Sequence, residues 1–283
     1  MSSLLSTLHA DLLRATAAAG AAVASAVVSS ARSAPAAAPG DPVDGQATDE
    51  ALLGLLRGRS IQQISDVVDL LVRIDGILPA GDGLKAFNLL YLRVTEQVRD
   101  WTAFEDRPWI LELDVLFAGF YFDGVETCLT APQAAPVAWQ TLMDRRYQPG
   151  VTAVQFALAG MSAHIIRDLA VAVVQTWQRL GPVDHARETI AFRDYLRIND
   201  VLDAVEPGAV RELATGLLAA LDSALAPVDG WAVMAVIHDL RDHSWTHAEN
   251  LAVIGLDTDQ ARAYVDRLDT IAADAGHAAL LTL

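Results

Sequence analysis

The sequence predicts an all-α protein: a single-domain, multi-helix bundle built around a long central apolar helix, with little or no sheet. Three observations predict this fold class. Nearly every segment after residue 49 has the periodicity of a helix, no stretch alternates in polarity like a strand, and stop signals separate the apolar segments. With 283 residues, 53% of them hydrophobic, the chain has enough apolar material for one large core.

The first 45 residues differ from the rest of the chain. Alanine dominates this stretch, and proline and glycine gather over residues 35–45, which predicts an Ala-rich helix followed by a linker. A secretory signal is disfavoured because Asp11 and Arg14 precede the alanine run, which is also too weakly hydrophobic to span a membrane. We therefore expect an arm over residues 1–45, an all-helical domain over residues 46–283, and no transmembrane segment.

The helices of the main domain are predicted in order from their start and stop signals. Ser60 is the expected N-cap of a helix that follows it, Pro108 suits a first helical turn, and Asp184 is an expected N-cap. Residues 152–179 are apolar nearly all round, which is typical of a helix surrounded by other helices, so we expect this helix at the centre of the fold. The stop signals lie at residues 78–83, 105–108, 130–136, 147–150, 181–184 and 206–208.

Charge and cysteine content exclude several classes of function. The chain has 36 acidic against 20 basic residues, a formal net charge of −16, and no run of lysine or arginine, so it is not expected to bind nucleic acid. The single cysteine, Cys128, excludes an internal disulfide and any multi-cysteine metal cluster. A cytoplasmic location is expected, and the oligomeric state is left open.

His164 and Asp168 are the first candidate site, within the apolar run GMSAHIIRDLAVAVV. Residues four apart share one face of a helix, so the two side chains are expected to touch. The pair suits two ligands of one metal ion, or a histidine base that a carboxylate orients. It also suits a structural pair in which each side chain satisfies the other.

Two neighbouring helices supply further acidic candidates. Asp114 is flanked by large apolar residues in LDVLF, and Tyr121 lies seven residues later on the same helical face. An acid in that company faces either inward to a partner or outward on a narrow solvated stripe. The segment AFRDYLRINDVLD carries Asp194 and Asn199, but because its charges occur all round the helix, most are expected to be solvated or paired locally.

A second constellation lies in VIHDLRDHSWTHAEN. Asp239, His243 and His247 are spaced four and four, and H-x3-H is a suitable two-ligand spacing for zinc or another divalent metal. His247 lies near the middle of the apolar face and His243 near its edge. The favoured interpretation is structural, with a polar turn of helix around a buried histidine, because no glutamate base accompanies the pair.

Five segments in this order resemble a bacterial helical family that is catalogued as a domain of unknown function. They are FNLLYLRVT (87–95), LDVLFAGFYFDG (113–124), GMSAHIIRDLAVAV (160–173), DYLRIN (194–199) and the pair Arg241 and Trp245. The resemblance covers most of the chain after the linker and implies a helical fold without an established reaction. The polar positions that match are Tyr91, Asp114, His164, Asp168, Asp194, Asn199 and Arg241.

The central motif departs from the pattern of that family, which runs closer to G-M-N-A-H-I-N-x-D-L-P. Here Ser162, Ile166 and Ala170 replace two asparagines and a proline, so a drier site is expected. A weaker similarity is to zinc-dependent phospholipase C and single-strand nuclease proteins, which use an H-x3-D pair on a central helix. The histidine expected soon after Asp168 is replaced by residues 170–174, which argues against a multi-zinc site.

These observations predict a small-molecule enzyme of specialised metabolism, with an apolar substrate between helices and either hydrolysis or proton-driven cyclisation or elimination as its reaction. His164 is the expected base or acid, Asp168 orients it, and Asp114 and Asp194 add acid–base groups or complete a divalent-metal site such as zinc. Tyr91, Asn199 and Arg241 complete the predicted site. The alternative is a non-catalytic module that binds an apolar ligand or a partner helix.

Overall fold

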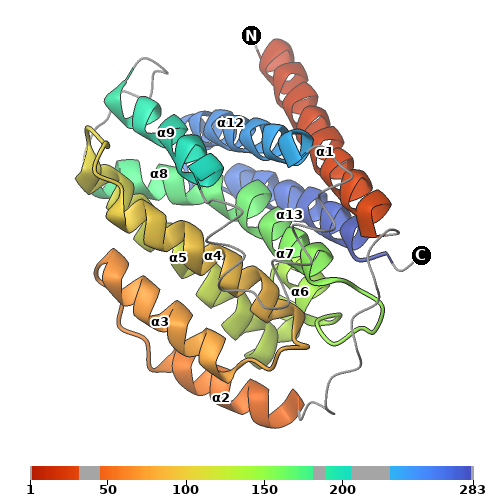
Figure 1. The fold of residues 1–283 in the computed structure, drawn as a ribbon. Coiled ribbons are helices and arrows are strands. Elements are labelled where there is room, and N and C mark those ends of the chain that lie inside the picture. The colour runs from red at the N-terminus through yellow and green to blue at the C-terminus, as the bar shows by residue number, and fades with distance from the viewer. Residues whose placement is uncertain (1, 32–44, 181–188, 205–229, 282–283) are drawn as a thin grey trace.

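The computed structural model describes residues 2–31, 45–180, 189–204 and 230–281, and every element in these ranges is a helix (Figure 1). The prediction of an all-α fold is confirmed. The elements are α1 (Ser2–Ala31), α2 (Gly45–Arg57), α3 (Ile64–Ile77), α4 (Gly83–Asp100), α5 (Arg107–Thr130), η1 (Pro132–Ala134), α6 (Val137–Met143), α7 (Ala153–Met161), η2 (Ser162–Asp168), α8 (Leu169–Leu180), α9 (Ile190–Ala204), α12 (Gly230–Ile254) and α13 (Asp259–Ala279).

The long apolar helix predicted at the centre is present. Helix α7, the segment η2 and helix α8 follow one another without a break from Ala153 to Leu180. By length and composition this is the one helix among the described residues that could cross a membrane, but 83% of its most apolar window is buried inside the molecule. Such burial is what the core helix of a helical bundle requires, because the surrounding helices need an apolar surface on every side.

The other helices surround this central helix (Figure 1). Helices α4 and α5 contact it on one side, and α12 and α13 contact it on another. Helices α2 and α3 pack outside α4 and α5, while α1 lies across α12 and α13. The buried apolar residues of all these layers form one continuous core, which extends from α1 to α13.

Helix starts agree with the expected signals at one place and differ at another. Pro108 lies in the first turn of α5, as predicted. Ser60 does not cap α3, because the helix begins three residues later than predicted, with Gln63 at its N-cap position. The Asp66 carboxylate accepts a hydrogen bond of 3.1 Å from the backbone N–H of Gln63, and so satisfies a donor that the helix leaves free. Asp184 lies outside the described residues.

The predicted N-terminal arm contains a helix, α1, that packs on the body of the protein. Leu13 and Ala24 on this helix are buried. Gly20 approaches α13 and η2 so closely that a Cβ atom there would lie 3.0 Å from Ala275 and 3.3 Å from Ile166. Helix α1 therefore approaches, at Ile166, the segment that carries His164. Most of the predicted linker lies outside the described residues.

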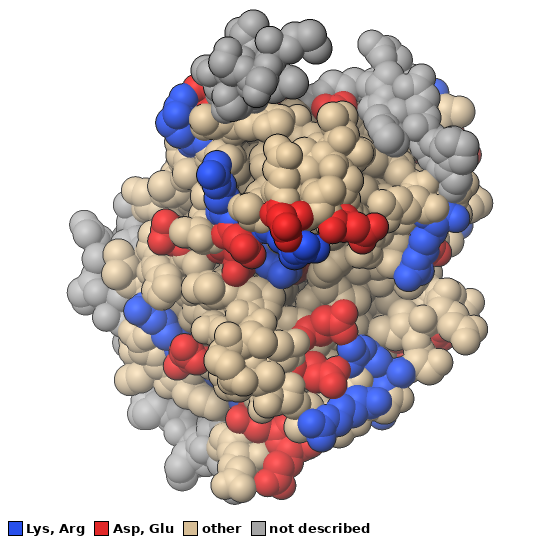
Figure 2. Space-filling view, turned by 180° about the vertical axis from the view of Figure 1, so that it is seen from behind, with Lys and Arg blue, Asp and Glu red and all other residues tan. Residues whose placement is uncertain are grey.

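Acidic and basic side chains alternate over the face shown in Figure 2, without a broad basic patch on that face. Many charged side chains of the described residues form ion pairs, such as Arg179 with Glu112 at 2.8 Å. Exposed pairs of this kind contribute little to stability, about 0 to 1 kcal/mol each.

Two glycines on α5 give a matched test of packing beside the central helix. A Cβ at Gly124 would lie 2.5 Å from the fully buried ring of Trp139, whereas a Cβ at Gly119 would meet nothing within 4 Å. Gly124→Ala is expected to lower the free energy of unfolding by about 1–3 kcal/mol through overpacking. Gly119→Ala is expected to raise it by up to about 1 kcal/mol through helix propensity. Urea unfolding measures both, and equal effects would contradict the packing.

Candidate functional site

His164 and Asp168 lie on a π-helical segment, η2, in the middle of the central helix. The backbone N–H of Leu169 bonds to the carbonyl oxygen of His164, five residues earlier, which widens the helix by one residue at this point. The Ser162 hydroxyl donates to the carbonyl oxygen of Leu158 at 2.9 Å and occupies another acceptor of this region. Short π segments within α-helices are frequent at functional sites. No pattern in the residues around His164 predicts this irregularity.

Aromatic rings enclose the His164 imidazole. Phe117 stacks on it with ring centroids 3.5 Å apart and planes within 6°, and Tyr91 meets it edge-on with centroids 4.7 Å apart. His164 is only 2% exposed, whereas Phe117, which stacks on it, is half-buried. The remaining rings around the imidazole are Phe87, Tyr121 and Trp139.

The Asp168 carboxylate is fully buried and accepts from three side chains. Its Oδ2 atom lies 3.3 Å from Nδ1 of His164 and 3.0 Å from Nε1 of Trp139. Its Oδ1 atom forms an ion pair with Arg167. The predicted contact between His164 and Asp168 is therefore confirmed. Because all three partners are donors to a carboxylate, the carboxylate remains the acceptor and fixes the orientation of the imidazole.

Asp269, on α13, supports the groups that hold Asp168. Its carboxylate caps the N-terminus of α6, where it accepts from the backbone N–H groups of Val137 at 2.8 Å and Ala138 at 3.1 Å. It also lies 3.3 Å from Nε of Arg167. Since α6 carries Trp139, one acidic side chain positions both the indole and the guanidinium that contact Asp168.

The electrostatics keep His164 neutral. Burial lowers the pKa of His164, and the hydrogen bond and charge of Asp168 oppose this shift only in part. In the neutral ring, Nδ1–H donates to Asp168, which leaves the lone pair of Nε2 available. Among the described residues, Nε2 has no hydrogen-bond partner although it is buried. This is the arrangement of an oriented general base without a bound proton donor.

Three more buried polar atoms lack a hydrogen-bond partner among the described residues: the hydroxyl of Tyr91, whose ring meets the imidazole, and Oδ2 of Asp114 and the hydroxyl of Thr95, which lie near Tyr91. Burial raises the pKa of Asp114 to about 7. Burial and the nearby charge of Asp114 raise the pKa of Tyr91 well above its usual value, and the nearby Thr95 hydroxyl opposes this rise only in part. The hydroxyls of Tyr91 and Thr95 do not meet the geometry of a hydrogen bond with each other. Buried polar groups are normally satisfied, so such a cluster calls for a ligand or ordered water.

Three other predicted site residues belong to separate networks. Asp194 is fully buried and accepts from the backbone N–H groups of Glu105 at 3.1 Å and Asp106 at 2.6 Å. Asn199 accepts from Nε of Arg241 at 2.8 Å, and the Arg241 guanidinium also donates to the backbone carbonyl of Tyr195 at 2.8 Å. These contacts hold a loop and two helices in place. The residues predicted to form one site therefore lie in separate places. Tyr91, Asp114, His164 and Asp168 are grouped together, and Asp194, Asn199 and Arg241 lie outside this group.

The predicted metal ligands do not form a metal centre in the described part of the chain. No group of three or more His, Cys, Asp and Glu side chains is arranged there to hold an ion. His243 and His247 share a hydroxyl instead: Oγ1 of Thr16, on α1, lies 3.3 Å from the first and 2.9 Å from the second. His247 also contacts the hydroxyl of Tyr264 at 2.8 Å. The contacts of His243 and His247 with Thr16 and Tyr264 therefore join α1 to α12 and α13.

Sequence reasoning missed some residues of the site. Thr95 lies four residues after Tyr91, and Phe117 lies three after Asp114, so helical spacing alone places both on the same faces as predicted residues. Trp139 and Asp269 had no such signal. Their contacts with Asp168 and Arg167 join elements that are distant in sequence.

The comparisons with known proteins place most of the described helices within one protein family. A family model described as a family of unknown function (DUF5995) matches residues 64–282. No curated protein and no solved structure matches the sequence. The match covers the helices that build the site, from α3 to α13, and begins after α1 and α2.

Proposed function

The chain belongs to the DUF5995 family, whose function is unknown, and we propose that it is a small-molecule enzyme that uses His164 as a general base. One observation carries the proposal. Among the described residues, four polar atoms on α4, α5 and η2 are buried without hydrogen-bond partners, and the Tyr91 side chain links them, since it meets the His164 ring and lies near Asp114 and Thr95. One of the four is a histidine nitrogen with an available lone pair. Leaving such groups unsatisfied costs about 1–3 kcal/mol each, which a purely structural cluster has no reason to retain.

The proposed roles follow from protonation states. His164 removes a proton through Nε2, and Asp168 holds the ring and stabilises the imidazolium that forms. Asp114, with a pKa of about 7, is present in both forms near neutral pH and supplies the complementary proton. The Tyr91 hydroxyl remains protonated and donates a hydrogen bond to an oxygen on which negative charge develops.

The substrate is proposed to be largely apolar, with one polar group that meets these four side chains. The aromatic surroundings and the burial of His164 exclude bulk water from the base. Proton-driven cyclisation or elimination fits such a dry site better than hydrolysis, in which water is a reactant. Phe117 is half-buried over the imidazole, so a turn of its side chain is the proposed route by which substrate reaches Nε2.

The second candidate is a non-catalytic module for an apolar ligand. It is favoured by Asp168, whose three donors satisfy it as they would in a structural pair. In that case the unpartnered atoms bind a polar group of a ligand that leaves unchanged. A metal-assisted reaction receives no support from the arrangement of side chains in the described ranges.

Turnover of an apolar metabolite extract tests the proposal. Wild type, His164→Gln and a control variant, His277→Gln, are incubated with the extract, and the metabolites are followed by mass spectrometry. We expect wild type and the control to consume at least one apolar metabolite, and His164→Gln to consume it about 10²–10⁴ times more slowly, the usual contribution of a general base. Unchanged metabolites in all samples, with one of them retained on wild-type protein, would support the binding module instead.

A further inference from the structure

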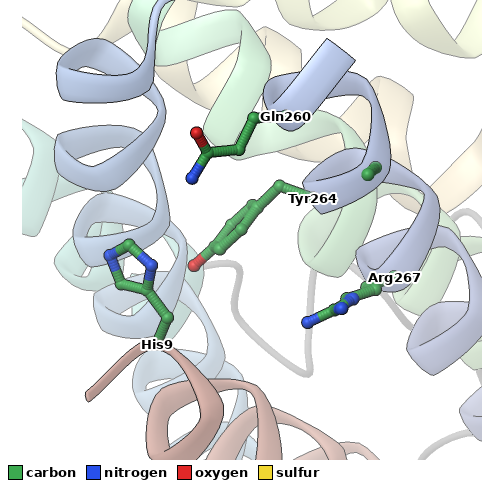
Figure 3. A pocket seen from close by; sticks show the side chains of 5 residues that line it. His9, Gln260, Tyr264 and Arg267 are labelled. Carbon is green, nitrogen blue, oxygen red and sulfur yellow. The ribbon is translucent and has the colours of Figure 1, made fainter. Parts of the chain in front are cut away.

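We propose a second ligand site, a pocket for a small organic carboxylate, on the seam between α1 and α13 (Figure 3). The pocket has a volume of about 200 Å³ and lies away from the residues around His164. One wall comes from His9 on α1. The others come from Gln260, Ala263, Tyr264 and Arg267, which recur at helical spacing on one face of α13.

Charge selects the class of ligand. Arg267 is exposed at the rim, and no carboxylate among the described residues forms an ion pair with it. Arg262, five residues earlier, is paired with Asp259 in the usual way. None of the residues that line the pocket is acidic, although the protein carries a net charge of −16. Gln260 adds an amide donor in the first turn of α13, where the helix dipole favours an anion.

A chain of hydrogen bonds decides whether the Tyr264 hydroxyl can donate a proton to a ligand. Nε2 of His9 lies 3.0 Å from Oδ1 of Asn250, whose amide donates to the hydroxyl of Tyr264 at 3.3 Å. The Thr16 hydroxyl donates to the carbonyl oxygen of Leu12 at 2.9 Å, so it accepts from Nε2–H of His247 at 2.9 Å. The Tyr264 hydroxyl then donates its one proton to Nδ1 of His247 at 2.8 Å. Because the tyrosine has no proton left for a ligand, the pocket recognises an anion through Arg267 and Gln260.

The body of the ligand is apolar. The Tyr264 ring separates His9 from Arg267 in Figure 3. Ala263 also lines the pocket and adds an apolar side chain to it. A guanidinium binds a planar carboxylate through two parallel hydrogen bonds, while an aromatic ring packs against an apolar or aromatic body. A small monocarboxylate such as benzoate matches these features and the volume. A bound ligand would contact α1 and α13 together and so hold α1 in place.

Calorimetric titration with benzoate at constant ionic strength tests the site, with benzamide and sulfate as probes of charge and shape. We expect wild type and Arg262→Gln to bind benzoate alike, and Arg267→Gln to bind it at least about tenfold more weakly, since it loses a charge-assisted bidentate contact. Benzamide and sulfate are expected to bind more weakly than benzoate by a similar factor. Both arginines are exposed, so neither variant is expected to unfold.

Three outcomes would overturn the proposal. They are equal affinity for benzoate in wild type and Arg267→Gln, equal losses in both arginine variants, and affinity for sulfate or benzamide as high as that for benzoate. The site does not depend on the proposed enzyme function, and His164→Gln is expected to bind benzoate like wild type. Protection of α1 from limited proteolysis by benzoate, in wild type but not in Arg267→Gln, would add a structural signature of the bridge.

Discussion

Replacing Asp114 with asparagine is expected to stabilise the protein more at pH 8 than at pH 4. Burial raises the pKa of this carboxyl from 3.8 to about 7, so the folded state holds the proton more tightly than the unfolded state. Its contribution to stability is greatest below pH 3.8 and is lost as the pH rises to about 7. A shift of this size corresponds to about 4 kcal/mol, which Asp114→Asn removes from the pH profile.

Urea unfolding of wild type and Asp114→Asn between pH 4 and pH 8 measures this difference. Asp266→Asn, an exposed substitution on α13, is the control and is expected to follow wild type. Parallel profiles of wild type and Asp114→Asn would mean that Asp114 is charged and solvated at neutral pH, and would remove its proposed role as an acid. Loss of metabolite turnover together with the gain in stability would be the signature of a functional group kept at a cost to folding.

His247→Gln is expected to have the opposite effect on the pH profile. Burial, with smaller contributions from the charges of His243 and His9, lowers the pKa of His247 from 6.5 to about 3. The unfolded state therefore binds the proton more tightly, and the stability present above pH 6.5 is lost as the pH falls toward 3. The full loss is on the order of 5 kcal/mol, and His247→Gln is expected to remove most of it.

The site of this loss is also predicted. Protonated His247 can no longer accept from the hydroxyl of Tyr264, so the contacts that join α1 to α12 and α13 through Thr16 weaken first. Hydrogen exchange of wild type at pH 7.5 and pH 4.5 is expected to show lower protection factors in α1 at the lower pH, after each rate is compared with the intrinsic amide exchange rate at that pH, which is slower in acid. His238→Gln, on the same helix, is the control. Acid sensitivity that is unchanged in His247→Gln would contradict the assignment.

The two variants form a single test, because Asp114 and His247 act in opposite directions over the same pH range. Wild type is expected to show a shallow profile, in which the two contributions partly cancel. Relative to it, Asp114→Asn is expected to gain stability as the pH rises, and His247→Gln as the pH falls. His164, whose pKa is also lowered by burial, adds to the slope in the direction of His247.

Local patterns predicted part of the candidate site. Helical spacing placed His164 and Asp168 on one face, and they do touch, even though the backbone between them is π-helical. The apolar neighbours of Asp114 left two positions open, inward to a partner or outward on a solvated stripe, and the side chain lies inward, 8% exposed. The pattern could not separate Asp194 from these residues, because its two backbone partners lie almost ninety positions away in the chain.

The sequence by itself determined the all-α class and the central helix over residues 153–180, because periodicity and apolar content are properties of a helix and its immediate neighbours. Only the tertiary structure decided which polar residues share a site. Trp139 and Asp269 reach the His164 region through the packing of α6 and α13. His247 was a candidate metal ligand together with His243, but it contacts Thr16 and so joins α1 to the body of the protein. Such contacts depend on the angles and distances at which helices pack, and no local pattern encodes these.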